Sequence, residues 1–197
     1  MSPKTFILIG RSGCGKGTQA KFLLEYLKSK DSSREIFYME TGARFREFIE
    51  RDSLSGKLSK AINKAGGLQP EFLAVWVWSN LFIENLKGDE HMIIDGTPRK
   101  LREAAVLDTA LDFYKREKPY VLHLDVSRKW SEKRLLERHR TDDLPEDIKK
   151  RLDWYETDVI PTINYYRDNP KYNFLDINGE RGIEEIQKDI LSKISLF

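Results

Sequence analysis

A glycine-rich loop between an apolar run and a helical pattern constrains this chain more than any other stretch. Residues 6–9 are apolar, the loop that follows holds glycines at 10, 13, 15 and 17 around Lys16, and a helical pattern begins at Gln19. Glycines let consecutive backbone N–H groups turn toward one anion, and a helix start adds its positive dipole end. The order strand, loop, helix predicts a phosphate-binding loop. The alternative is a flexible turn that contains a lysine by chance.

The loop satisfies most of the P-loop pattern that binds nucleoside triphosphates. Gly10 is followed after four residues by Gly15 and Lys16. Gly17 stands where Ser or Thr is usual, and the hydroxyl comes one residue later, at Thr18. The pattern predicts a triphosphate site but does not identify the group that receives a phosphate.

Length and composition limit the remaining possibilities. A chain of 197 residues is long enough for one well-buried core, so we expect a single domain over 1–197. Its 34 Lys and Arg against 32 Asp and Glu argue against a nucleic-acid surface that depends on bulk charge. The single cysteine, Cys14, excludes an internal disulfide, and neither an apolar leader nor a membrane-length apolar run is present. We therefore expect a cytoplasmic protein without membrane contact.

Strand-like and helical patterns alternate along the chain. The strand-like runs lie at about 5–10, 36–39, 91–95, 120–125 and 173–177. This alternation predicts an α/β fold whose parallel sheet is covered on both faces by helices. Between the second and third strands lie three helical patterns, near 42–52, 55–65 and 70–87, which is more than one crossover needs. The excess predicts an inserted helical subdomain.

Several arginines each stand next to a predicted turn or strand end. They are Arg46, Arg99, Arg138, Arg140 and Arg151. Phosphoryl transfer is catalysed mainly by positioning and charge neutralisation, which convergent arginines supply. Each of them taken alone is equally well explained as a solvated surface residue.

Taken together, four motifs resemble those of the adenylate kinase family in order and spacing. They are residues 10–19, Thr41-Gly42 with Arg46, residues 95–99 (Asp-Gly-Thr-Pro-Arg), and Asp142-Asp143 followed by Arg151. The resemblance covers nearly the whole chain. It implies a five-stranded parallel P-loop core over 1–39 and 88–197, a monophosphate-binding helical insert over about 40–70, and a lid. The implied activity is reversible phosphoryl transfer from Mg-ATP to a nucleoside monophosphate.

The resemblance also implies roles for individual residues. ATP contacts are implied for Gly13, Cys14, Gly15, Lys16, Gly17, Thr18, Arg134 and Arg138. Monophosphate contacts are implied for Thr41, Gly42, Arg46, Leu68, Gly96, Arg99, Glu103, Arg140 and Arg151. Catalysis is implied for Lys16, Arg99, Arg138, Arg140 and Arg151. Asp95 and Thr18 would hold Mg2+ through water; the alternative for Asp95 is to cap the turn before Pro98.

The chain departs from the family pattern at three places. Ser12 replaces the usual loop proline, and Thr97 replaces an aromatic residue. Glu103 stands where a glutamine contacts the base; ionised, it offers only acceptors and would favour guanine or cytosine, but it is alternatively a solvated surface residue. Only His139 separates Arg138 from Arg140, which leaves a vestigial lid over about 138–143.

We favour AMP as the acceptor, and three alternatives stay open. These are a kinase for GMP or CMP, a kinase for a small alcohol, and a nucleotide-binding regulator without turnover. Four apolar side chains of the 70–87 pattern are expected in the core or in an oligomer contact, namely Phe72, Trp76, Trp78 and Leu81. On the pattern near 127–138 we expect Trp130, Leu135 and Leu136 on the core side.

Overall fold

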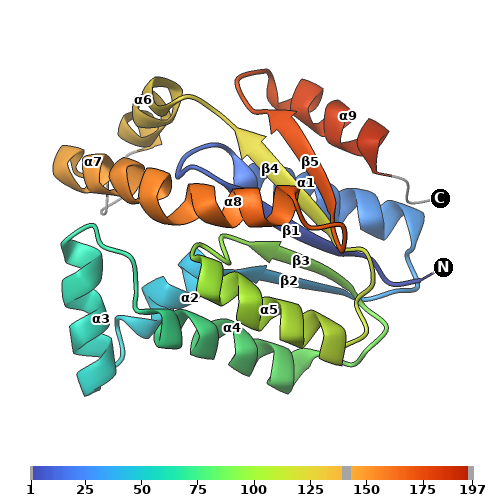
Figure 1. Ribbon diagram of the computed structural model, residues 1–197, viewed down its shortest axis with the longest axis horizontal. Helices are drawn as coiled ribbons and strands as arrows, with labels where there is room; N and C mark the ends of the chain where they lie inside the picture. The colour runs from blue at the N-terminus through green and yellow to red at the C-terminus, as the bar shows by residue number, and fades with distance from the viewer. Residues whose placement is uncertain (1, 139–142, 195–197) are drawn as a thin grey trace.

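A single five-stranded parallel sheet forms the centre of the molecule (Figure 1). The computed structural model describes residues 2–138 and 143–194. The strands stand in the order β2-β3-β1-β4-β5. Their bounds are β1 Thr5–Gly10, β2 Ile36–Glu40, β3 His91–Asp95, β4 Tyr120–Asp125 and β5 Asn173–Asn178. The predicted α/β class and all five predicted strands are confirmed.

The helices of the described residues follow the predicted order. Their bounds are α1 Lys16–Lys30, α2 Thr41–Phe48, α3 Leu54–Lys64, α4 Glu71–Asn85, α5 Leu101–Phe113, α6 Arg128–Arg138, α7 Pro145–Trp154, α8 Ile160–Arg167 and α9 Ile183–Lys193. In Figure 1, α1 and α9 lie behind the sheet, whereas α4, α5 and α8 cross its front. The sheet is therefore covered on both faces, as a buried parallel sheet requires.

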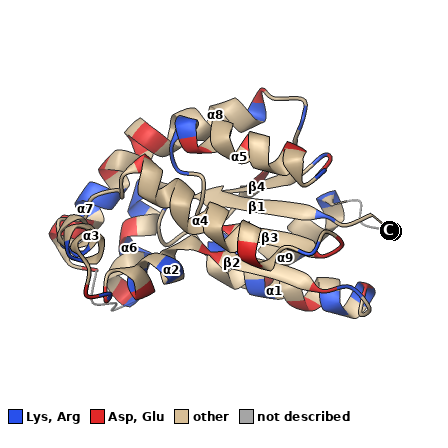
Figure 2. Cartoon of the chain, turned by 90° about the horizontal axis from the view of Figure 1, so that it is seen from below, with Lys and Arg blue, Asp and Glu red and all other residues tan. Residues whose placement is uncertain are grey.

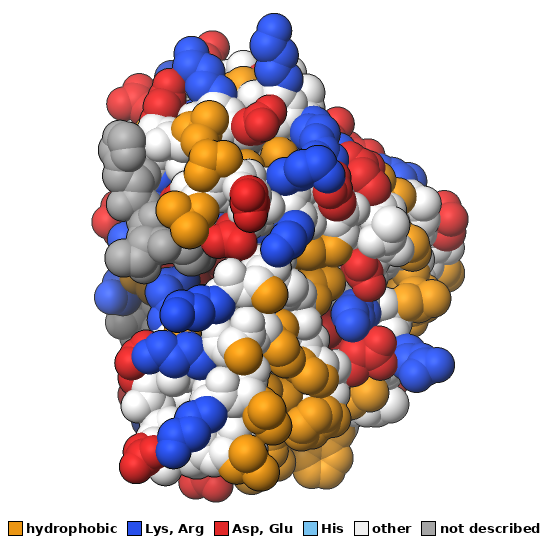
Figure 3. All heavy atoms as spheres, turned by 90° about the vertical axis from the view of Figure 1, so that its left-hand side faces the viewer, with side chains coloured by type: hydrophobic (Ala, Val, Ile, Leu, Met, Phe, Trp, Pro, Cys, Tyr) orange, Lys and Arg blue, Asp and Glu red, His pale blue; other side chains and the backbone are white. Residues whose placement is uncertain are grey.

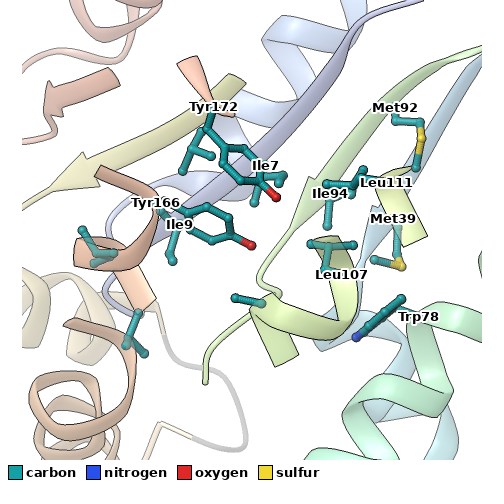
Figure 4. Close-up of a cluster of buried hydrophobic side chains, with 14 of the residues drawn as sticks. Ile7, Ile9, Met39, Trp78, Met92, Ile94, Leu107, Leu111, Tyr166 and Tyr172 are labelled. Atoms are coloured by element: carbon teal, nitrogen blue, oxygen red, sulfur yellow. The ribbon is translucent and has the colours of Figure 1, made fainter. Parts of the chain in front are cut away.

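The alternation of side chains along β1 explains the continuous apolar run in the sequence. Phe6 and Leu8 pack into the cluster with α1 and α9, while Ile7 and Ile9 pack into the cluster with α4, α5 and α8. All four are essentially buried. Figure 4 shows part of the second cluster, with Ile7 and Ile9 facing the same layer as Trp78 and Leu107. Because both faces of β1 are buried, no polar residue interrupts the strand before the loop.

The long helical region after residue 144 is interrupted near Pro161. Proline has no N–H to donate within a helix and its ring crowds the preceding turn. A π-helical turn, η1 (Tyr155–Val159), separates α7 from α8, and the N–H of Ile160 bonds to the carbonyl of Tyr155. The helix accommodates Pro161 by a widened turn.

One apolar prediction, for Leu136 on α6, needs correction. Leu135 is fully buried and Trp130 packs against the α1–α9 cluster, but Leu136 is 46% exposed. Successive helical residues point about 100° apart, so Leu136 turns away from the face that Leu135 shares with Ser131. On α4, Trp78 is buried and Leu81 is half-buried, whereas Phe72 is 71% exposed and Trp76 is also exposed.

The helices α3, α6 and α7 gather at one end of the molecule (Figures 1 and 2). Figure 2 shows basic and acidic residues interspersed along the helices, which agrees with the balanced net charge of +2. Figure 3 shows this end as a surface on which hydrophobic side chains gather in the lower part. Within the described residues, no helix has the length and apolarity that crossing a bilayer demands.

Candidate functional site

A polar cleft of about 970 Å3 opens at the carboxyl ends of β1 and β3. In the sheet, Leu8 of β1 pairs with Asp95 of β3, so the loop after β1 and the turn after β3 start side by side. Ligands of open α/β sheets bind at this edge, where the loops leave the strands. The cleft is lined by the glycine loop, the starts of α1 and α2, the loop after α3, and residues of α6 and α7.

The glycine loop has a backbone that other residues cannot adopt without strain. Gly10, Gly13 and Gly15 all have positive φ, at 149°, 81° and 100°. A Cβ on Gly13 would lie 2.9 Å from Cγ of Leu135, and one on Gly10 would lie 2.6 Å from the carbonyl oxygen of Leu124. The glycines therefore let the loop pack directly under α6 and against the end of β4.

Lys16 and the start of α1 give the loop its positive character. The Lys16 Nζ donates to the carbonyl oxygens of Gly10 and Arg11, both at 2.8 Å. The ammonium group thus lies inside the curve of the loop. Among the described residues, no side chain caps the first turn of α1, whose N-cap is Gly15. Free helix-start amides beside an ammonium group form an anion site.

Asp95 faces this anion site from β3. A Cβ on Gly17 would meet Oδ2 of Asp95 at 3.5 Å, so the carboxyl lies against the first turn of α1. Asp95 is 5% exposed, and Thr18 lies on the cleft wall beside it. The residues that the structure describes contain no cluster of three or more potential metal ligands. One carboxylate and one hydroxyl suit Mg2+, which keeps several waters and takes other ligands from phosphates.

Arg138 and Arg151 meet on one buried carboxylate. Arg138 donates from Nε and Nη2 to Asp143 at 2.9 and 2.8 Å, and Arg151 donates from Nη2 to the same side chain at 2.8 Å. The Asp143 side chain is 1% exposed. The carboxylate fixes two guanidinium groups from different helices, so both point from one place into the cleft.

Arg99 is held between the turn after β3 and α7. Its Nε donates to the carbonyl of Gly96 at 3.0 Å, and its guanidinium lies over the ring of Trp154 at 5.4 Å. Trp154 in turn donates from Nε1 to the carbonyl of Gly66 at 3.2 Å. Burial lowers the pKa of Arg99 from its ordinary value. A guanidinium remains charged even so, and it offers its other donors to the cleft.

The opposite wall is formed by the start of α2. Arg46 donates from Nη2 to Glu40 at 2.8 Å, and both side chains are partly exposed. The Thr41 hydroxyl is buried and has no hydrogen-bond partner among the described residues. Gly42 lies under the Arg46 guanidinium, since a Cβ there would be 3.3 Å from Nη1. A buried hydroxyl without a partner beside a movable arginine suits the binding of a polar ligand.

Glu103 lines the cleft next to this wall. Its side chain is 3% exposed, and Oε2 accepts the N–H of Arg99 at 2.8 Å, which caps the start of α5. Burial raises the pKa of this carboxyl, and the hydrogen bond from Arg99 opposes that shift. The interpretation of Glu103 as a solvated surface residue is therefore wrong.

Comparison with known proteins agrees with the motifs. A family model described as adenylate kinase matches residues 8–171. The protein named adenylate kinase 1 of Nostoc sp. is 33% identical over 184 residues, 93% of this chain and 95% of the relative. The adenylate kinase of Flavobacterium psychrophilum is 32% identical over 194 residues, 96% and 97% of the two chains. That of Thermosynechococcus vestitus is 33% identical over 196 residues, 95% of each.

The chain belongs to the adenylate kinase family. Most of the residues for which membership implies a role line one cleft. They are Gly13, Gly15, Lys16, Gly17, Thr18, Thr41, Gly42, Arg46, Leu68, Asp95, Gly96, Arg99, Glu103, Arg134, Arg138 and Arg151. Arg140 lies outside the described residues. The Cys14 side chain is 1% exposed and belongs to the α1–α9 core, so only its backbone is available to a phosphate.

Three residues that contact the arginines of the cleft carried no sequence prediction of such a contact. Asp143 joins Arg138 to Arg151, Trp154 supports Arg99, and Trp130 lies under the guanidinium of Arg134 at 4.8 Å. Trp154 follows Arg151 by three residues, which is one helical turn and the only sequence signal for it. Asp143 stands in the Asp-Asp motif, five residues after Arg138 and eight before Arg151, and the motif gave no sign that it pairs with both arginines.

Proposed function

We propose that this protein is an adenylate kinase, which reversibly transfers the terminal phosphoryl group of Mg-ATP to AMP and gives two ADP. The observation that carries the proposal is a single cleft with two anion-binding walls. The glycine loop with Lys16 forms one wall, and Arg46 with Arg99 forms the other. A protein that only senses ATP has no use for the second wall.

ATP would bind along the glycine loop. We assign the phosphates to the amides of residues 13–18 and to the Lys16 ammonium, because these donors surround one place. The adenine of ATP would lie against Arg134, whose guanidinium is already supported by the Trp130 ring. Mg2+ would be held by the ATP phosphates and by water on Asp95 and Thr18, and it would neutralise charge on the transferring group.

The monophosphate would bind across the cleft. We assign its phosphate to Arg46 and Arg99, and its base to the wall that includes Thr41, Gly42, Leu68 and Glu103, beside Gly96. Arg138 and Arg151 would contact the phosphoryl group in transit, since Asp143 orients both into the same space. We assign Arg140 the same role from the sequence motif alone. Positioned positive charge of this kind supplies most of the catalysis of phosphoryl transfer.

We also propose how the chain is divided and where it works. The insert of about 40–70 carries the acceptor wall and moves over the cleft, and the segment of about 138–143 acts as a minimal lid. The single cysteine is buried, which suits a reducing, cytoplasmic setting. An oligomer stays possible, and no contact with nucleic acid or membrane is proposed.

A coupled transfer assay tests the proposed function. Purified protein with Mg-ATP is given AMP, GMP, CMP or UMP, and ADP formation is followed with and without the acceptor. We expect AMP to be the best acceptor and hydrolysis of ATP without acceptor to be nearly absent. Lys16→Met, which removes the ammonium from the loop, serves as the inactive control. No transfer to any monophosphate by the folded wild-type protein would refute an enzyme and favour a regulator.

A further inference from the structure

The Glu103 carboxyl is a buried acid without an ion-pair partner among the described residues. Its side chain is 3% exposed, and Oε2 accepts a hydrogen bond of 2.8 Å from the backbone N–H of Arg99, while the backbone of Lys100 also donates to the carboxyl. The Arg99 guanidinium is directed to the carbonyl of Gly96 and the ring of Trp154. The cost of burying an ionised carboxylate without a direct ion pair outweighs these two backbone hydrogen bonds, so burial favours the neutral acid.

A neutral carboxylic acid and an ionised carboxylate present different hydrogen-bonding groups. The neutral acid has one O–H donor and one C=O acceptor, which is the pattern of a glutamine amide. The pairing edge of adenine has one acceptor, N1, and one donor, the N6 amino group. The ionised form has acceptors only and cannot satisfy N1. The charge state of Glu103 therefore decides whether adenine fits.

We propose that Glu103 contacts the acceptor adenine as the neutral acid, so that use of AMP is coupled to the protonation of this one side chain. Oε2, which already accepts from Arg99, stays the carbonyl oxygen and takes a hydrogen from N6 with its second lone pair. Oε1 carries the proton and donates to N1. This inference rests on the proposed function, because it names how the acceptor wall selects its base.

The groups around Glu103 set the pH range of this coupling. From its own loop it faces Arg99 and Lys100, which favour the charged form, and from α8 it faces the buried Tyr166. Glu71 on α4 lies 3.9 Å from the Lys100 ammonium and does not contact Glu103 itself. Burial outweighs these contributions and raises the pKa of Glu103. The proton is therefore lost as the pH rises, and AMP binding weakens in the same direction.

The test compares KM for AMP in the wild type and in Glu103→Gln from pH 5.5 to 8.5 at saturating Mg-ATP. Glutamine keeps the acceptor for the Arg99 N–H and carries its donor at every pH. The AMP phosphate, with a second pKa of about 6, titrates identically for both proteins and cancels in the ratio. We expect KM of the wild type divided by KM of Glu103→Gln to rise by about tenfold per pH unit above the pKa of Glu103.

Glu71→Gln is the matched control, because it removes a carboxyl from the same corner that does not line the cleft. Its KM for AMP is expected to follow the wild-type pH profile. A flat ratio for Glu103→Gln across the range would show that Glu103 only caps α5 and would overturn the inference. A wild type that comes to prefer GMP or CMP as the pH rises, while Glu103→Gln does not, would support the inference, because the ionised carboxylate offers only acceptors.

The two proposals fail in different ways. If the wild type transfers no phosphoryl group to AMP at any pH, the proposed function is wrong and the ratio has no meaning. If it uses AMP with a ratio that does not change with pH, the function stands and only the role of the proton on Glu103 is wrong.

Discussion

The wall of the cleft formed by the glycine loop and the wall formed by α2 hold their charges in different ways. Around the loop, Gly10 and Gly13 touch Leu124 and Leu135 so closely that no side chain fits between them. Lys16 is held by two loop carbonyls. On the other wall, the Arg46 side chain is 45% exposed and pairs with the partly exposed Glu40. The position of Lys16 is fixed by tightly packed backbone. The position of Arg46 depends on an exposed ion pair, for which water competes.

This difference indicates which wall changes when ligands bind. A loop packed against α6 and β4 cannot shift without opening those contacts, so under the proposed function it would be formed before ATP binds. Arg46 would give up only an exposed ion pair on turning to a phosphate, at a cost of about 1 kcal/mol or less. Arg138 and Arg151 are held less firmly than the loop but more firmly than Arg46, because both pair with the buried carboxylate of Asp143.

The largest effect is expected for the arginines on Asp143. Arg151→Ala removes a charge that is 12% exposed and fixed at the cleft, and we expect the turnover number to fall by about 10^3 to 10^5. Urea unfolding should remain cooperative, because Arg138 still neutralises Asp143. Arg128→Ala is the control: it removes an exposed arginine that pairs with Asp153 on the same helix as Arg151, and its turnover should match the wild type. Comparable activity in Arg151→Ala and Arg128→Ala would contradict the assigned role.

A methyl group in the loop tests how firmly the first wall is fixed. Gly13→Ala combines a positive φ with a contact of 2.9 Å to Leu135, and we expect unfolding free energy to fall by about 2 to 4 kcal/mol. Gly88→Ala has a positive φ but nothing within 4 Å, so it should lose only about 1 to 2 kcal/mol. Urea denaturation of both variants measures the difference. Equal stabilities would mean that the loop is not tightly packed.

The smallest of these effects is expected on the wall formed by α2. Arg46→Ala should raise KM for AMP by about tenfold to a hundredfold, the equivalent of one charged hydrogen-bonding contact, and leave KM for ATP unchanged. Stability should change little because the ion pair with Glu40 is exposed. Arg44→Ala removes the exposed partner of Glu47 from the same helix and should leave both constants at wild-type values. A rise in KM for ATP in Arg46→Ala would contradict the assignment of this arginine to the AMP side of the cleft.

Periodicity and motif order were sufficient for most of the fold. The five strands were predictable because a parallel sheet buried on both faces requires continuous apolar runs, such as residues 6–9. That the candidate residues gather at one cleft was predictable, because the loop, the start of α2 and the turn after β3 all follow strand ends, which meet at one edge of a parallel sheet. Leu136 was misplaced because an apolar residue type does not specify its helical face where two leucines are adjacent.

The sequence by itself determined the phosphate loop, since only glycine tolerates its backbone and the pattern is local. It also determined the sheet and the arginines that follow its strands. Only the tertiary structure decided that Glu103 is buried, that Asp143 joins two arginines, and that Trp154 supports a third. Burial and charge pairing depend on how the elements pack in three dimensions, and a side chain's chemistry changes with its neighbours. The sequence left Glu103 open between a base contact and a solvated residue, and its burial rules out the second of these.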